Sequence, residues 1–114
     1  MVVARLSPVE LTRFGAVPAV DRTRTRVVLV PRLTPGIAAM TIGRYVLVRR
    51  GHERDRALLA HELVHVRQWR ELGAIGFAAR YLGAYVGNRL RGLDHWNAYE
   101  AIPLEMEARS LAGA

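Results

Sequence analysis

Residues 61–65 read His-Glu-Leu-Val-His, an H-E-x-x-H motif that carries the clearest chemistry in the sequence. Because His61 and His65 are four residues apart, they share one face of an α-helix, and their imidazoles can bind one metal ion. Glu62 lies one step round the helix and can reach a water molecule on that ion. Such a site supports metal-assisted hydrolysis with Glu62 as the general base. The competing interpretation is a pair of half-buried structural histidines, with Glu62 in a surface ion pair to Arg67.

A catalytic zinc site needs a third protein ligand, and this sequence contains no cysteine that could supply it. Three carboxylates follow within residues 99–109, namely Glu100, Glu105 and Glu107. On a helix that starts at Leu104, Glu105 and Glu107 flank the apolar face on opposite sides, so at most one of them can bind the ion. The periodicity does not choose between them. The plain alternative for Glu105 is a solvent-facing ion pair with Arg109.

The motif at residues 61–65, followed by Glu105-x-x-Ala108, resembles the gluzincin zinc metallopeptidases, in particular very small members and bacterial zincin-like domains. The resemblance covers roughly residues 24–112. It implies one Zn²⁺ ion bound by His61, His65 and Glu105, with Glu62 as the base in peptide-bond hydrolysis. Glu107 and Glu100 stay as alternative third ligands. The family has an aspartate four residues after the third ligand, where this sequence has Arg109.

The resemblance also implies an edge strand beside the cleft that pairs with an extended peptide or protein substrate. We expect this strand to be formed by Tyr45, Val46, Leu47 and Val48. A second hypothesis is a non-catalytic interaction module that keeps the zincin fold, with a structural zinc ion or no metal.

Hydrolysis of a peptide also requires a hydrogen-bond donor for the developing oxyanion. Candidates near the third ligand are Tyr99, His95 and Arg109. Gln68 lies close to the metal-facing side of the motif helix, where it can hydrogen-bond to a ligand. An aromatic stripe after the motif is typical of core packing, with an apolar specificity pocket as the alternative, and consists of Phe77, Tyr81 and Tyr85.

The motif must be held by a helix, and the apolar spacing predicts one over residues 53–72, with Asp55 in its first turn and Gly73 at its end. Further helices are expected over residues 74–112, interrupted after Gly92 and restarted near Asp94 and at Pro103. A helix start is also predicted at Ser7, Pro8 and Glu10 within an N-terminal helix and connector at residues 1–23.

Residues 24–48 contain runs of β-branched residues separated by Pro31, Pro35 and Gly36, and Gly43 divides the second run into a hairpin. These runs predict two or three antiparallel strands. The expected fold is therefore α+β, with a small antiparallel sheet packed on a helical half. Its 114 residues are enough for one domain, residues 1–114, with one core.

All 17 basic residues are arginines, and the formal net charge is +7. They are scattered along the chain, which does not favour the third hypothesis, a nucleic-acid-binding protein. The apolar stretch at residues 72–87 is interrupted by Arg80 and three glycines, so we expect a buried or interfacial helix and no transmembrane segment. The absence of a secretory signal pattern predicts a cytoplasmic protein. Exposed sheet edges permit a homodimer.

Overall fold

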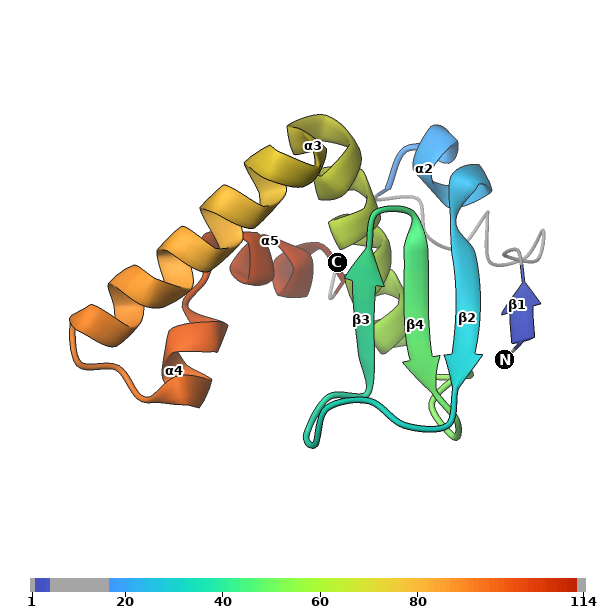
Figure 1. Ribbon diagram of the computed structural model, residues 1–114. Helices are drawn as coiled ribbons and strands as arrows, with labels where there is room; N and C mark the ends of the chain where they lie inside the picture. Colours follow the sequence, from blue (N-terminus) through green and yellow to red (C-terminus); the bar gives the residue numbers. More distant parts are fainter. Residues whose placement is uncertain (1, 5–16, 113–114) are drawn as a thin grey trace.

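The computed structural model describes residues 2–4 and 17–112. Within these ranges the chain forms four strands and four helices (Figure 1). In chain order they are β1 (Val2–Ala4), α2 (Ala19–Arg24), β2 (Arg26–Val30), β3 (Ala39–Ile42), β4 (Tyr45–Arg49), α3 (Arg56–Leu90), α4 (His95–Glu100) and α5 (Pro103–Ala112). The predicted α+β class is confirmed. The helix start predicted at Ser7 lies outside the described residues.

The four strands form one sheet in the order β1-β2-β4-β3. β3 and β4 form the predicted antiparallel hairpin, with Gly43 in the turn at a φ of 63°. β2 and β4, however, are parallel, so the sheet is mixed where we expected it to be antiparallel. The reason is the connection at residues 31–38, which leads from β2 to the outer position of the sheet and leaves a gap of one strand between β2 and β3. The hairpin then brings β4 back between β2 and β3.

This strand order corrects the predicted edge strand. Tyr45, Val46, Leu47 and Val48 lie in β4, which is paired on both sides and has no free edge for a substrate. The outer strand beside the helices is β3. The periodicity of residues 45–48 identified a strand but carried no information about which strand would be outermost.

Helix α3 has two arms, because Gly73 interrupts it with non-helical backbone angles of φ 72° and ψ 167°. We call residues 56–72 the first arm and residues 74–90 the second arm. The predicted N-terminus is present: the Asp55 side chain accepts a hydrogen bond from the Leu58 amide. The predicted break at Gly73 is also present, and it turns the second arm away from the sheet (Figure 1).

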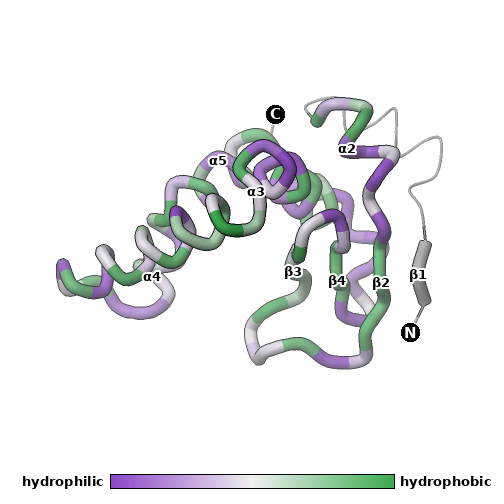
Figure 2. The backbone as a smooth tube through the Cα atoms, turned by 45° about the horizontal axis from the view of Figure 1, so that its top comes forward, coloured by the Kyte–Doolittle hydropathy of each residue, from purple (hydrophilic) through white to green (hydrophobic). Residues whose placement is uncertain are grey.

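The core lies between the sheet and the first arm of α3. Val46 and Val48 point from β4 toward Leu63 and Val66, and Ala108 of α5 joins the same buried cluster. Figure 2 shows hydrophobic residues along β2 and β4, the inner strands that supply this face. This packing fixes the motif helix between β3 on one side and α5 on the other.

Helix α2 was not predicted, because its six residues show no helical periodicity. It is held to the first arm of α3 by Asp21, which is fully buried and accepts two hydrogen bonds from Arg70 at 2.6 and 3.0 Å. The fixed geometry of such a two-point contact orients α2 on α3. No helix in the described part of the chain is both long enough and apolar enough to cross a membrane.

Candidate metal centre

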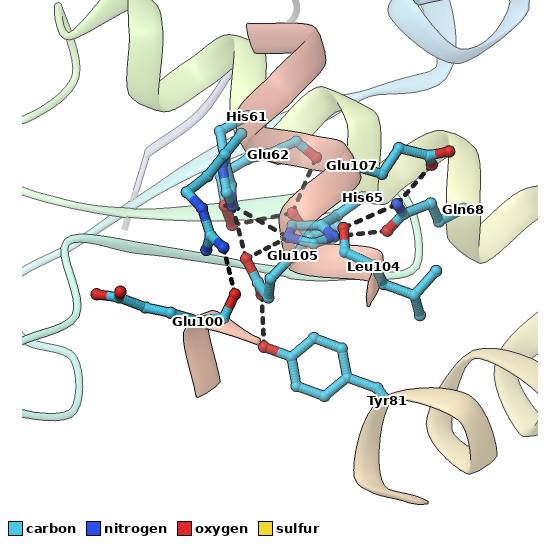
Figure 3. Close-up of polar contacts among 11 residues, drawn as sticks. His61, Glu62, His65, Gln68, Tyr81, Glu100, Leu104, Glu105 and Glu107 are labelled. Atoms are coloured by element: carbon cyan, nitrogen blue, oxygen red, sulfur yellow. Dashed lines mark hydrogen bonds and ion pairs between the residues drawn. The ribbon is translucent and has the colours of Figure 1, made fainter. Parts of the chain in front are cut away.

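Three side chains from two helices converge beside β3 (Figure 3). The Oε1 atom of Glu105, on α5, lies 2.8 Å from His61 Nε2 and 3.1 Å from His65 Nε2, on the first arm of α3. The two Nε2 atoms are 3.2 Å apart. Glu105 and His65 are buried, whereas His61 is partly exposed.

These separations fit one tetrahedral metal ion. Zinc binds histidine nitrogen and carboxylate oxygen at about 2.0 to 2.2 Å, which places two ligand atoms of a tetrahedron roughly 3.3 Å apart. The three atom pairs in this cluster are separated by 2.8 to 3.2 Å. Two nitrogens and one oxygen from the protein leave one tetrahedral position for water or substrate, as in catalytic zinc sites.

Gln68 determines which nitrogen of His65 faces the cluster. Its amide nitrogen donates to the Leu104 carbonyl at 3.0 Å and to the Glu107 carboxylate at 2.8 Å. The amide oxygen of Gln68 is therefore turned toward His65 and accepts a hydrogen bond from Nδ1 at 2.7 Å. With its proton on Nδ1, the neutral form of His65 directs the lone pair of Nε2 into the cluster, and this is the form that binds a metal. When Nε2 is protonated as well, it donates a hydrogen bond to Glu105.

Glu105 is held as a carboxylate in a buried place. Its second oxygen, Oε2, accepts a hydrogen bond from the Tyr81 hydroxyl at 2.5 Å. Burial on its own would raise the pKa of Glu105, but the hydrogen bonds from His61, His65 and Tyr81 outweigh it and keep that pKa well below the usual range. Burial and the bond to Glu105 raise the pKa of Tyr81, so its hydroxyl stays a donor.

Glu62 lies beside the cluster, with Oε2 4.0 Å from His61 Nε2. The Thr41 hydroxyl, on β3, is 3.2 Å from the other carboxylate oxygen of Glu62 and 3.1 Å from its backbone carbonyl. Burial raises the pKa of Glu62 despite the nearby histidines. Thr41 thus fixes one oxygen of Glu62 and leaves the other free beside the histidines.

Burial would lower the pKa of His65, but its hydrogen bond to Glu105 and the charge of that carboxylate reverse the direction and raise it. In the metal-free protein, His65 therefore shares a proton with Glu105 more readily than an exposed histidine would.

The other predicted carboxylate ligands do not reach the histidines. Glu107 is exposed and forms an ion pair with Arg67 while it accepts from Gln68. The Glu100 carboxylate points away from the cluster in Figure 3. Among the three carboxylates considered as third ligand, only Glu105 is brought to His61 and His65.

Of the candidate oxyanion donors, two line a cavity beside the cluster and one does not. His95 is hydrogen-bonded to the Tyr85 hydroxyl at 2.8 Å and lines neither of the cavities beside the cluster. Tyr99 lines both of these cavities, and burial together with the charge of Glu105 raises its pKa. Arg109 lines one cavity and donates to the backbone carbonyl of Glu100.

These two cavities meet at Glu62. One, of about 300 Å³, extends along β3 toward the second arm of α3 and is mainly apolar. Its aromatic and aliphatic lining consists of Met40, Ile42, Trp69, Phe77 and Tyr81. The other, of about 540 Å³, extends from Ala39 toward the start of the motif helix. Both share Ile37, Ala39, Glu62 and Tyr99, so together they form a cleft along β3.

Sequence reasoning did not assign Thr41 or Tyr81 to the cluster. Thr41 is 21 residues from Glu62 and Tyr81 is 24 residues from Glu105. No local spacing links such pairs. The only signal for Tyr81 was its place in the aromatic stripe, which predicted packing and not a hydrogen bond to a carboxylate.

Comparison with known protein families gives a match over part of the chain. Residues 32–73 match the family described as eCIS core domain. This segment runs from the loop before β3 through the motif to the break at Gly73, which is well under half of the chain, and it excludes Tyr81 and Glu105. Neither the curated proteins nor the solved structures contain a match to this chain.

Proposed function

We propose that this protein is a zinc-dependent metallopeptidase that uses His61, His65 and Glu105 as ligands and Glu62 as the general base. The observation that supports it most is the convergence of the three ligand atoms on one point, with a second buried carboxylate, that of Glu62, beside them. Structural zinc sites are closed by four protein ligands, whereas three ligands with an adjacent carboxylate that does not bind the ion match a catalytic site.

Zinc, when bound, would activate a water molecule and polarise the substrate carbonyl. The chain's own residues supply the remaining parts of the reaction. Glu62 accepts a proton at the oxygen that Thr41 leaves free, and later returns it to the leaving amine. The Tyr99 hydroxyl is the preferred donor to the developing oxyanion, because it lines both halves of the cleft and remains protonated.

The outer strand β3 is suited to align the substrate. Ala39 to Ile42 line the cleft, and β4 occupies only one edge of this strand. An extended peptide can therefore add to the outer edge of β3, which no other described strand occupies, beside the cleft that Glu62 lines.

The test combines metal content with turnover. Protein purified from zinc-supplemented medium is expected to contain about one zinc ion per chain, and to cleave an unstructured protein such as casein. Glu62→Gln should keep the zinc and lose at least about 100-fold in cleavage rate, the usual contribution of a general base. Glu105→Gln should lose the zinc itself.

Glu100→Gln is the matched control, because it removes an exposed carboxylate that lines neither half of the cleft. It should keep most of the zinc and of the activity. Purified protein without zinc would overturn the proposal. Zinc binding with equal, negligible cleavage by the wild type and Glu62→Gln would favour the non-catalytic module.

A further inference from the structure

The larger cavity beside the cluster contains one cationic side chain. Arg109 lines this 540 Å³ cavity together with His61, Glu62 and Tyr99. It follows Glu105 by one helical turn on α5, so the two residues share a face of that helix. Because helical side chains lean toward the N-terminus, Arg109 extends back along the turn that carries Glu105.

The guanidinium of Arg109 has N–H donors available for a ligand. Arg109 is exposed, and its side chain donates one hydrogen bond within the described residues, to the backbone carbonyl of Glu100. No carboxylate pairs with it among residues 17–112. Asp55 lines the same cavity, but its side chain already caps the motif helix at the Leu58 amide. A guanidinium offers five donors in a planar fork, which matches the two oxygens of a carboxylate.

The direction of a bound peptide follows from β3. Antiparallel pairing is slightly more stable per residue than parallel pairing, so a substrate is expected to run opposite to β3. Its N-terminal part then lies beside Ile42 and the apolar cavity. Its C-terminal part passes Ala39 and enters the cavity that contains Arg109.

We propose that Arg109 binds the free α-carboxylate of a peptide, so that the site removes one or two residues from a C-terminus. This rests on the proposed peptidase function. The four residues from Glu105 to Arg109 rise about 6 Å along the helix axis, which corresponds to about two residues of extended chain. A carboxylate on Arg109 therefore places the first or second peptide bond from the C-terminus at Glu62. Water adds across that bond, giving a shortened peptide with a new carboxylate and a free amino acid or dipeptide.

Binding is measured first, without turnover, on the zinc-loaded Glu62→Gln protein. Three fluorescein-labelled peptides are compared by anisotropy. The first two share one sequence and end in a free carboxylate or an amide, and the third is the amide with an internal glutamate added. The free acid should bind about tenfold or more tightly than both amides, because a charged two-point hydrogen bond is lost in each. Arg109→Gln in the same background should remove the difference.

Arg80→Gln is the matched control, since Arg80 is an exposed arginine on the second arm of α3 and lines neither half of the cleft. It should preserve the preference for the free acid. Equal binding of the acid and the plain amide, or equally tight binding of the peptide with the internal glutamate, would overturn the proposal.

Cleavage products of the wild type separate this inference from the proposed function. Loss of one or two C-terminal residues from the acid peptide, with the amide resistant, supports both. Equal internal cleavage of acid and amide peptides supports the peptidase and overturns the role of Arg109. Absence of cleavage, with an acid preference that Arg109→Gln removes, overturns the peptidase and retains the carboxylate site.

Discussion

At the scale of single residues, the amide of Gln68 is the side chain on which the histidine pair depends. It is 2% exposed, and both ends of its amide are used, by His65 on one side and by Leu104 and Glu107 on the other. Gln68→Leu should weaken zinc binding about 10-fold to 100-fold, because Nδ1 of His65 loses the acceptor that holds its proton. Competition with a fluorescent chelator measures this affinity, and an unchanged value would contradict the assignment.

The pH dependence of zinc binding follows from His65. Because the folded, metal-free protein raises the pKa of His65, this proton stabilises the fold below the ordinary histidine pKa, and the stabilisation is lost as the pH rises through the raised value. Zinc must displace the proton, so its apparent affinity should increase with pH over the same interval. Calorimetry at about pH 6.5 in buffers of different ionisation enthalpy should detect proton release. The idea fails if no proton is released.

At the scale of elements, the break at Gly73 joins the motif to Tyr81. The backbone angles of Gly73 lie in a region that is nearly closed to other residues, so Gly73→Ala should cost about 1–3 kcal/mol of stability. It should also weaken zinc binding, since the second arm carries the Tyr81 hydroxyl to Glu105. Thermal denaturation and zinc titration measure the two effects.

Gly83→Ala is the control for this substitution. Gly83 lies within the helical second arm, and an added Cβ would meet no atom within 4 Å. Here alanine should stabilise the helix by about 0.5–1 kcal/mol and leave zinc affinity unchanged. If both variants behave alike, the special conformation of Gly73 has no role in the site.

The break at Gly73 also shows which parts of the site could be predicted from the sequence and which could not. The helical period placed His61, Glu62 and His65 on one helix, and Gly73 marked the end of its first arm. Neither the helical periodicity nor the position of Gly73 indicates the direction of the second arm relative to the first. The hydrogen bond from Tyr81 to Glu105 therefore could not be predicted. The hairpin at Gly43 was predictable from the sequence. The outer position of β3, however, depends on the path of the connection at residues 31–38 along the sheet. Thr41 was missed for that reason.

At the scale of the whole molecule, zinc would connect the first arm of α3 to α5, because these two helices carry its proposed ligands. A ligand that binds only the folded state stabilises it by about 2.7 kcal/mol at a concentration of 100 Kd. Zinc should therefore raise Tm by several degrees in the wild type and in Glu62→Gln. Glu105→Gln should show little increase, and a similar increase in all three proteins would place the ion elsewhere.

The cluster also has a consequence for how the protein is made. Glu105 follows His61 by 44 residues, and Tyr81, which supports it, lies between them. Closing a chain segment of that length costs about 3 kcal/mol of entropy, and the packing of α5 must offset this cost before the third ligand arrives. A nascent chain that ends before α5 has the complete H-E-x-x-H motif but no cluster. The candidate metal centre is thus completed only after α5 has left the ribosome.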